Sequence, residues 1–419
     1  MTDGPFTIAR LDAAAQGVAP GPDGPIRIAR ALPGEVVTGI VAGVRIADPR
    51  ILEPAPERVA PPCPHFRRCG GCALQHASDA FVAGWKARRV TDALRAAGVA
   101  GRVGTVRTSP PRSRRRAALK GRKTKKGALV GLHAARSHDL VAIPDCRLLH
   151  PDLMAVLPDL EALTRRAAPR GGEIGLHVTR TATGVDLSVT GAKAADDALL
   201  PDLARAFARV TWNGAPLTMT ARPEIVLGPA RVAPPPGAFL QATASGEAAL
   251  RAAVRDIVFG TEAGADAHAG PIGDLFAGLG TFALDLARDA PVTAWEGDGA
   301  ALDALAAAHR ATPGLRPIAT RRRDLFRDPV RAEEMVGLRA AVVDPPRAGA
   351  AAQFAELARS DLSVIAAVSC DPDTFARDAA ILTEAAWRMG PVAVVDQFRW
   401  SAHVELVAGF RRDTGLGGA

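Results

Sequence analysis

Apolar runs of strand length alternate with helical segments over the last part of the chain. From Ile272 onward the runs PIGDLFAG, PVTAWEGD, AAVVDPPR, LSVIAAVSCD and VELVAGF are separated by Ala-rich stretches. Buried parallel strands read as continuous apolar runs, and the helices between them cover both faces of the sheet. The pattern predicts an α/β fold with a doubly wound parallel sheet, and function is expected where its strands end.

The region before it is patterned differently. Residues 5–55 read as short strands separated by Gly and Pro, as in a small β-barrel, and the Pro-rich stretch EPAPERVAPPCP follows as a joint. Helical periods cover residues 79–98 and 151–167, while alternation around a Gly predicts a hairpin over residues 175–191. We predict three domains: a barrel over 1–57, a central α+β domain over 58–235 and the α/β domain over 236–419.

Charge narrows the class of partner. The 419 residues carry a net charge of +8, and residues 112–126 hold nine Lys or Arg and no acid. A solvated basic loop is one interpretation, and a phosphate-binding surface is the favoured one. No apolar stretch is long enough for a membrane span and no secretory signal is visible, so a cytoplasmic protein is expected.

Three of the five cysteines lie within ten residues, with spacing C-x5-C-x2-C, in CPHFRRCGGCALQH. In a reducing compartment such a group indicates metal or catalysis more than disulfides. Thiolates suit zinc or an iron–sulfur cluster, and the sequence alone leaves both open. His65 and His76 are near enough in sequence to ligate as well. The candidate ligands are Cys63, Cys69, Cys72 and, further along, Cys146.

The fifth cysteine, Cys370, ends the apolar run LSVIAAVSC. Asp371 is expected to cap a helix whose first residue is Pro372. A cysteine facing a helix N-terminus gains thiolate character from the dipole and the free amide groups. We therefore expect Cys370 to be a reactive nucleophile.

A glycine-rich loop lies in DLFAGLGTFALDLA, where Gly278, Gly280 and Ala283 form G-x-G-x-x-A between a strand and a helix. Glu296 ends the next strand, where a carboxylate can accept hydrogen bonds from a ribose. Dinucleotides and S-adenosylmethionine both need these two features. The acidic-Pro-Pro stretch at Asp344 favours a methyltransferase acting on bases over a dinucleotide oxidoreductase.

CPHFRRCGGCALQH, FLQAT, DLFAGLGTF, DPPRAG, SCDPDTFARD and HVELVAGF occur in this order. With them the chain resembles the RNA uracil-5-methyltransferases, specifically the iron–sulfur-cluster-bearing bacterial type that modifies 23S ribosomal RNA. The resemblance covers nearly the whole chain. It implies a Rossmann-like catalytic domain that binds S-adenosylmethionine, a cluster-bearing central domain and an N-terminal TRAM-like (OB-like) barrel. Thr243, Thr281 and Asp371 stand where the family commonly has Asn.

The resemblance also implies roles for individual residues. Cys370 would add to carbon 6 of uracil, and Glu405 would remove the proton from carbon 5. His403 lies two residues before Glu405, on the same face of the predicted strand. From that position it is either a residue that orients the carboxylate or the RNA, or a plain polar strand residue. A [4Fe-4S] cluster would bind Cys63, Cys69, Cys72 and Cys146. S-adenosylmethionine would bind Gln241, Phe276, Gly278, Gly280, Thr281, Glu296 and Asp324, with Asp344 beside the cofactor and the reacting base.

The resemblance thus implies a 23S rRNA uracil-C5-methyltransferase whose partner is RNA. It is expected to be a monomer with no membrane association and no stable protein partner, and its cluster is expected to be structural. The alternatives are a transfer RNA uracil-C5-methyltransferase and a non-catalytic, metal-stapled RNA-binding protein.

Overall fold

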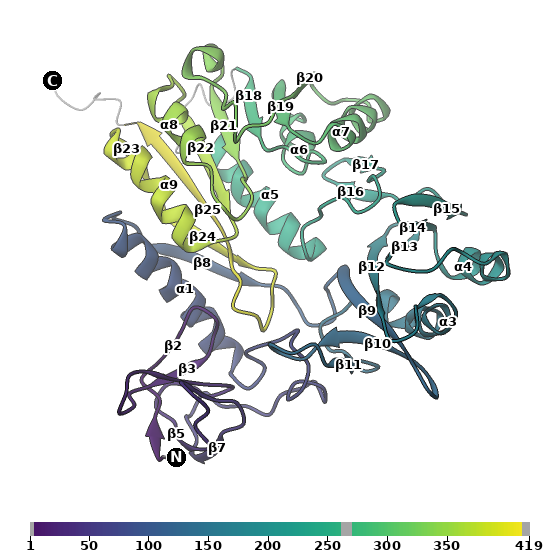
Figure 1. The fold of residues 1–419 in the computed structure, drawn as a ribbon. Coiled ribbons are helices and arrows are strands. Elements are labelled where there is room, and N and C mark those ends of the chain that lie inside the picture. Colours follow the sequence, from purple (N-terminus) through teal and green to yellow (C-terminus); the bar gives the residue numbers. More distant parts are fainter. Residues whose placement is uncertain (1–3, 261–269, 413–419) are drawn as a thin grey trace.

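The computed structural model of the protein describes residues 4–260 and 270–412. Within them, a nine-stranded sheet forms the centre of the C-terminal half, with strand order β20-β19-β18-β21-β22-β25-β24-β8 and β23 beside β25 (Figure 1). Its first five strands are parallel, as predicted. These are β18 (Ile272–Leu275), β19 (Val292–Glu296), β20 (Ile318–Arg322), β21 (Ala340–Val343) and β22 (Val364–Ser369).

The other half of the sheet corrects the prediction of an all-parallel sheet. β25 (Glu405–Arg412) runs antiparallel to β22, to β23 (Trp387–Met389) and to β24 (Val392–Asp396). β24 in turn pairs in parallel with β8 (Val103–Thr108), which comes from the middle of the chain. An apolar run predicts a buried strand, but it does not encode the direction of its neighbour. The observed fold is α/β with a mixed sheet.

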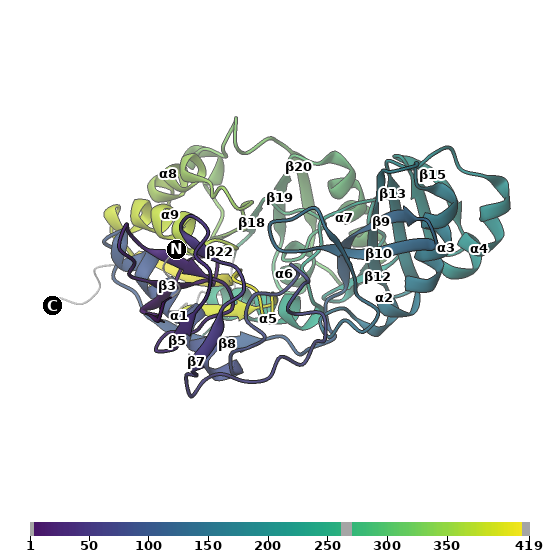
Figure 2. The same ribbon diagram turned by 60° about the horizontal axis from the view of Figure 1, so that its bottom comes forward.

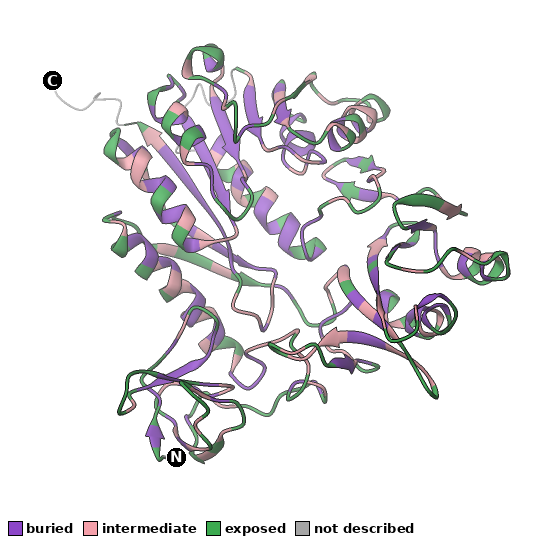
Figure 3. Cartoon of the chain, viewed as in Figure 1, coloured by how far each residue is buried: buried purple, intermediate pink, exposed green. Residues whose placement is uncertain are grey.

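Helices cover both faces of this sheet, and successive residues of β21 separate the two cores. Val342 packs in one cluster with α5 (Ala244–Phe259), α6 (Ala283–Leu286) and α7 (Gly299–Ala311). Ala341 packs in the other with α1 (Asp79–Ala96), α8 (Ala351–Arg359) and α9 (Pro372–Glu384). The period of two along a strand sends alternate side chains to opposite faces. Figure 3 shows the resulting buried strands between half-buried helices.

α1 begins and ends where its sequence signals lie. Ser78 accepts a hydrogen bond from the Phe81 amide at 3.2 Å, and Gly98 at φ +72° follows the last turn. Lys86 and Asp396 form an ion pair whose two side chains are fully buried, which anchors α1 to the end of β24. Among the described residues, no helix combines the length and the apolarity needed to cross a bilayer.

The remaining elements form two smaller β-rich regions (Figure 2). The N-terminal region holds a three-stranded sheet, β1-β5-β7, and a four-stranded sheet, β2-β3-β4-β6. Its strands are β1 (Phe6–Thr7), β2 (Arg10–Leu11), β3 (Gly17–Ala19), β4 (Ile26–Ile28), β5 (Val36–Thr38), β6 (Arg45–Ile46) and β7 (Arg50–Glu53).

The central region holds a seven-stranded sheet, β11-β10-β9-β12-β13-β14-β15, and the hairpin β16-β17. The predicted hairpin is β12–β13, and the helix predicted over 151–167 is split into α2 and α3. The strands are β9 (Arg116–Thr124), β10 (Gly127–His133), β11 (Leu140–Ala142), β12 (Glu173–Thr181), β13 (Gly184–Thr190), β14 (Arg209–Trp212), β15 (Ala215–Met219), β16 (Ile225–Leu227) and β17 (Ala230–Val232). The helices are α2 (Pro151–Ala155), α3 (Leu157–Ala167) and α4 (Leu200–Ala206).

Candidate active site

Three polar residues meet at one edge of the large sheet. Cys370 follows β22, Asp344 follows β21, and Glu405 begins β25. In the antiparallel ladder Ser369 pairs with Leu406, so continuing the register by one residue brings Cys370 and Glu405 side by side. The sheet thus assembles a thiol and two carboxylates from segments that are distant in sequence.

Burial raises the pKa of both carboxyl groups. Burial, followed by the charge of Asp344, raises the pKa of Glu405 to about 8, and a hydrogen bond from Gln397 opposes the rise. Burial raises the pKa of Asp344 to about 7. A carboxylate with a pKa near neutrality is suited to accept a proton during a reaction.

The thiol does not have the thiolate character expected from the sequence. Burial, and then Glu405, Asp344 and Asp371, raise the pKa of Cys370 to about 12. Asp371 does cap α9 as predicted, accepting from the amides of Asp373 and Thr374 at 3.0 and 3.3 Å. Because the cap already occupies these amides and places a negative charge beside the sulfur, the helix N-terminus does not stabilise a thiolate here. The expectation of an activated thiolate in the free protein was wrong.

The glycine-rich loop lies between β18 and α6, as predicted. Gly278 adopts φ +55° and a Cβ there would meet no atom within 4 Å, so the backbone faces open space. Gly280 adopts φ +87°, and a Cβ there would lie 2.4 Å from Leu305. Glu296, at the end of β19, accepts from the Gly278 amide at 3.0 Å and the Asp298 amide at 2.9 Å. The carboxylate and the loop therefore form one unit.

The other residues predicted to contact the cofactor are spread around this unit. Phe276, at φ +63°, packs its ring 5.4 Å from that of Phe326. Asp324 lies just beyond β20 and its Oδ1 accepts from the Phe326 amide at 3.1 Å. Thr281 lies on the glycine loop itself, half-buried. Gln241 comes from a different segment, the stretch before α5, where it is 4% exposed.

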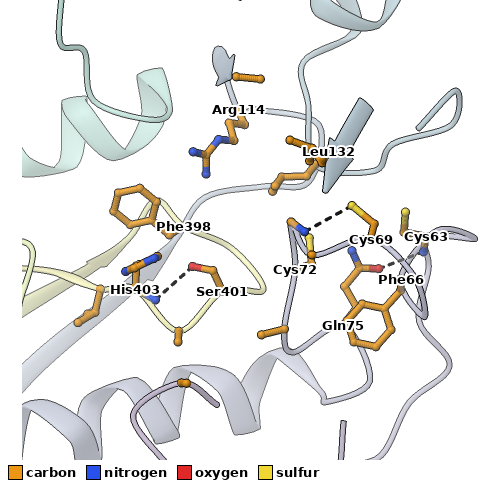
Figure 4. Close-up of a pocket in the computed structure, with 18 of the residues that line it drawn as sticks. Cys63, Phe66, Cys69, Cys72, Gln75, Arg114, Leu132, Phe398, Ser401 and His403 are labelled. Atoms are coloured by element: carbon orange, nitrogen blue, oxygen red, sulfur yellow. Dashed lines mark hydrogen bonds between the residues drawn. The ribbon is translucent and has the colours of Figure 1, made fainter. Parts of the chain in front are cut away.

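The four remaining cysteines and Cys370 line one cavity of about 860 Å³ (Figure 4). Arg114 projects into it between the cysteine side and the side formed by Phe398 and His403 (Figure 4). Its guanidinium lies 5.8 Å from the centre of the Phe398 ring, and that ring lies 5.6 Å from His403. The candidate nucleophile and the candidate metal ligands thus share one chamber.

The loop that carries Cys63, Cys69 and Cys72 is held by polar contacts. Cys63 donates its amide to Gln75 Oε1 at 3.1 Å, and Cys69 forms an isolated β-bridge with Ala134. His65 accepts from the Asp145 amide at 3.2 Å, which connects this loop to the segment of Cys146. His76 is 1% exposed and stacks on Phe66. Of the two histidines, His65 alone is among the residues that line the cavity.

None of the cysteines that line this cavity forms a disulfide. Within residues 4–260 and 270–412, no three His, Cys, Asp or Glu side chains adopt a metal-ligating arrangement. The thiols do influence one another: burial first, then neighbouring thiols, raise the pKa of Cys72 to about 12. Four thiols converging on one cavity are a soft donor set, which is the chemistry that iron–sulfur clusters and zinc use.

The basic segment is used partly inside the protein. Arg115 is buried, pairs with Glu247 and donates to the Gln241 carbonyl at 2.9 Å. Arg122 pairs with Glu173 across the sheet. The exposed part of the segment consists of Arg112, Lys123, Lys125 and Lys126. The predicted phosphate-binding surface is therefore smaller than the nine charges suggested.

Sequence analysis missed Gln397. This residue follows β24, is 1% exposed, and contacts both Gln241 and Glu405. The signal was present, because Asp396 and Gln397 end the apolar run VAVV just as the other polar residues end theirs.

Comparisons with known proteins identify the family of the chain. The sequence profile of the tRNA (uracil-5-)-methyltransferase family matches residues 321–411. An uncharacterised RNA methyltransferase of Rhizobium meliloti is 43% identical, with 97% of this chain and 99% of the relative covered. The 23S rRNA (uracil(1939)-C(5))-methyltransferase RlmD of Dichelobacter nodosus is 32% identical, with 96% and 97% covered.

A solved structure shares the fold along nearly the whole chain. It is the tRNA (uracil-54, C5)-methyltransferase of Pyrococcus abyssi in complex with S-adenosyl-L-homocysteine. The TM-score is 0.75 at 20% sequence identity, with 97% of this chain and 99% of that chain covered.

Proposed function

Because the chain belongs to the RNA uracil-5-methyltransferase family, we propose that it methylates carbon 5 of one uridine in 23S ribosomal RNA through a covalent bond from Cys370. The observation that carries the proposal is the pairing of Cys370, which lines the large cavity, with the buried carboxylate of Glu405 on the adjacent strand. The choice of 23S RNA is supported by the relative from Dichelobacter nodosus.

The chemistry follows from the electronics of uracil. Carbon 5 is a weak nucleophile until the sulfur of Cys370 adds to carbon 6, which turns the ring into an enolate while the thiol proton leaves to solvent. S-adenosylmethionine would supply an electrophilic methyl group for carbon 5, and its sulfur would keep the bonding electrons and leave as S-adenosylhomocysteine. Glu405 then takes the proton from carbon 5, and the carbon 6–sulfur bond breaks to restore the double bond and the free Cys370.

We assign the methyl donor to the glycine loop and its surroundings. The open space beside Gly278 and the carboxylate of Glu296 support this assignment, since such a loop can approach a ligand closely while the acid accepts ribose hydroxyl bonds. The residues assigned are Gln241, Phe276, Gly278, Gly280, Thr281, Glu296, Asp324 and Asp344.

We assign a [4Fe-4S] cluster to the cysteine side of the cavity. The support is that four free cysteines line one cavity, from two segments that are joined by the His65–Asp145 hydrogen bond. The cluster would tie these segments together, and no step of the methyl transfer requires it. The residues assigned are Cys63, Cys69, Cys72 and Cys146.

The target uridine has to leave its stack to reach Cys370. We propose that the end of the β9–β10 hairpin holds the RNA backbone meanwhile. Lys123, Lys125 and Lys126 are exposed there, and residues 112–126 contain no Asp or Glu. The N-terminal region, residues 1–57, is proposed to extend this RNA contact.

Purified protein, labelled S-adenosylmethionine and either a 23S rRNA transcript or a transfer RNA pool test the proposal. We expect label in 5-methyluridine of the ribosomal RNA, and no label with Cys370→Ala, whose RNA affinity should equal that of the wild type. A 5-fluorouridine-substituted transcript should form a covalent adduct with the wild type and none with Cys370→Ala. Absence of label in both RNAs would refute the methyltransferase assignment.

Transfer RNA is the second candidate substrate. It is favoured by the family profile, which bears the name of the transfer RNA enzymes and matches the strands that carry Asp344, Cys370 and Glu405. Label confined to the transfer RNA pool would replace 23S RNA as the substrate while leaving the chemistry intact.

A further inference from the structure

Gln397 occupies a central place that the proposed chemistry does not use. It follows β24, two residues after Val395, the residue that pairs with Glu405 at the start of β25, and is 1% exposed. An amide buried to this extent costs free energy unless its donors and acceptor are all used. The partners of this side chain therefore indicate what it is for.

The hydrogen bonds of Gln397 fix the orientation of its amide. Its Oε1 accepts from the backbone amide of Ala242 at 2.7 Å. A backbone N–H can only donate, so the oxygen must face Ala242 and the NH₂ group must face the other way. There, Nε2 donates to Oε1 of Gln241. The same side chain is the hydrogen-bonding neighbour that lowers the pKa of Glu405. The NH₂ group thus serves two different segments, that of Gln241 and that of Glu405.

Packing holds the side chain in this place. A Cβ on Gly246, in the first turn of α5, would lie 2.6 Å from the Cβ of Gln397. Glycine at this position, which has no Cβ, allows the close approach of the Gln397 side chain to the helix backbone. Gln397 is consequently clamped between the N-terminus of α5 and the edge of the sheet.

We propose that Gln397 is a positioning residue that aims the carboxylate of Glu405 for proton removal and ties it to Gln241 on the segment before α5. The inference rests on the proposed function, in which Glu405 is the base and Gln241 contacts the methyl donor. Through one amide, the residue that removes the proton and the segment that contacts the donor move as a unit.

The electrostatics agree with this geometry. Burial and Asp344 raise the pKa of Glu405 to about 8, while donation from Gln397 favours the ionised carboxylate. The charge of Glu405 also acts on Cys370, where it adds to the effect of burial in raising the pKa of the thiol. The charged groups at the ends of α5 and β24 are neutralised by partners, Glu247 by Arg115 and Asp396 by Lys86. Gln397 is thus the neutral donor that opposes protonation of the base.

Gln397→Met tests the role, because methionine has a similar volume and cannot donate. Gln353→Met is the matched control: Gln353 is also fully buried in the same half of the protein, and its amide bonds only the backbone of Val330. Methyl transfer to the RNA is measured as a function of pH for both variants and the wild type, together with the amount of covalent protein–RNA adduct.

With Gln397→Met, the rise of activity with pH should move upward by about one pH unit, since the base loses the bond that favours its ionised form. Activity near neutral pH should fall about tenfold, and the adduct should accumulate because proton removal is slowed. Gln353→Met should lower the unfolding temperature and leave the pH profile in place. Gln397→Asn, which keeps the amide but shortens it, should lie between Gln397→Met and the wild type.

A pH profile and adduct level unchanged in Gln397→Met and Gln397→Asn would overturn the inference and leave Gln397 as a packing residue. If Gln397→Met does not fold, an unchanged profile in Gln397→Asn decides alone. Failure of the proposed function is distinguished by the wild type, which would then neither methylate RNA nor form the adduct.

Discussion

The edge of the sheet that carries Cys370 and the loop that carries Cys63, Cys69 and Cys72 border the same cavity, yet different forces hold them. Cys370 and Glu405 are placed by the continuous ladder of β22 and β25, between two apolar cores. The cysteine loop has no helix or strand of its own. It is held by separate contacts, such as the hydrogen bond of the Cys63 amide to Gln75 and the stacking of Phe66 on His76.

This difference indicates what each region depends on. A sheet edge keeps its geometry when one of its polar side chains is changed, because the backbone ladder remains. A loop with few buried contacts has low local stability unless another bond joins its parts. We therefore expect substitutions at the sheet edge to abolish methyl transfer without changing the stability of the fold. Substitutions in the cysteine loop should first lower the stability of the fold.

Cys146→Ser is expected to have the largest effect on folding. At the proposed cluster, as at structural zinc sites where it amounts to roughly 10 kcal/mol, the free energy of metal binding would become folding free energy. The variant should lose its iron and its brown colour in anaerobic preparations, and its unfolding temperature should drop sharply. Cys370→Ser is the matched cysteine control and should keep both, since it lies at the sheet edge. Wild-type iron content in Cys146→Ser would contradict the cluster assignment.

Glu405→Gln should lower turnover by about 10²- to 10⁴-fold, the usual effect of losing a general base. Covalent adduct should accumulate, because addition of Cys370 does not need Glu405.

The pKa of Glu405 is raised to about 8 in the fold, above that of an exposed glutamate, so its ionisation opposes folding as the pH rises between these two values. Urea titrations should therefore find the variant at least as stable as the wild type at pH 8, with an advantage that vanishes at acidic pH. A destabilised variant at pH 8 would refute this.

Lys86→Met addresses the connection between the two regions, because α1 directly follows the cysteine loop and packs on the sheet. Removing one member of a buried ion pair costs about 3–5 kcal/mol, since the other charge is left without a partner. Urea unfolding should detect this loss. The double variant Lys86→Met/Asp396→Asn should recover a large part of it, and no recovery would mean that Lys86 acts by packing alone.

Ser78→Ala should have the smallest effect. It removes the side-chain cap of α1, which accepts from the Phe81 amide, at a cost of about 1 kcal/mol. Thermal unfolding should shift slightly downward while methylation at low temperature and iron content stay at wild-type values. Loss of iron in this variant would show that the cysteine loop depends on the start of α1.

Local sequence signals predicted much of this site, since Asp344, Glu296 and Cys370 each end an apolar run. Parallel strands bring their carboxyl ends to one edge, so the grouping of these residues followed from the pattern. The direction of β25 and the entry of β8 into the sheet did not follow, because strand pairing across long sequence separations leaves no mark in the periodicity of either strand.

The sequence also did not predict which charged side chains are buried and which partners they have. The basic segment counted as one surface, yet Arg115 is buried against Glu247, a residue 132 positions away. Similarly, the polarity of Asp371 predicted the helix cap but not its repulsion of the neighbouring sulfur. Electrostatic roles depend on which side chains meet in space, and the linear pattern does not contain that.

The pairing of β8 with β24 has a consequence for how the protein is made. Lys86 and Asp396 are 310 residues apart, so a nascent chain carries α1 and β8 without their partners until almost all of it has been synthesised. A fragment starting at residue 236 would present β24 as an open edge, with the carboxylate of Asp396 lacking its cation. The catalytic half therefore completes its sheet only when the earlier half of the same polypeptide closes it.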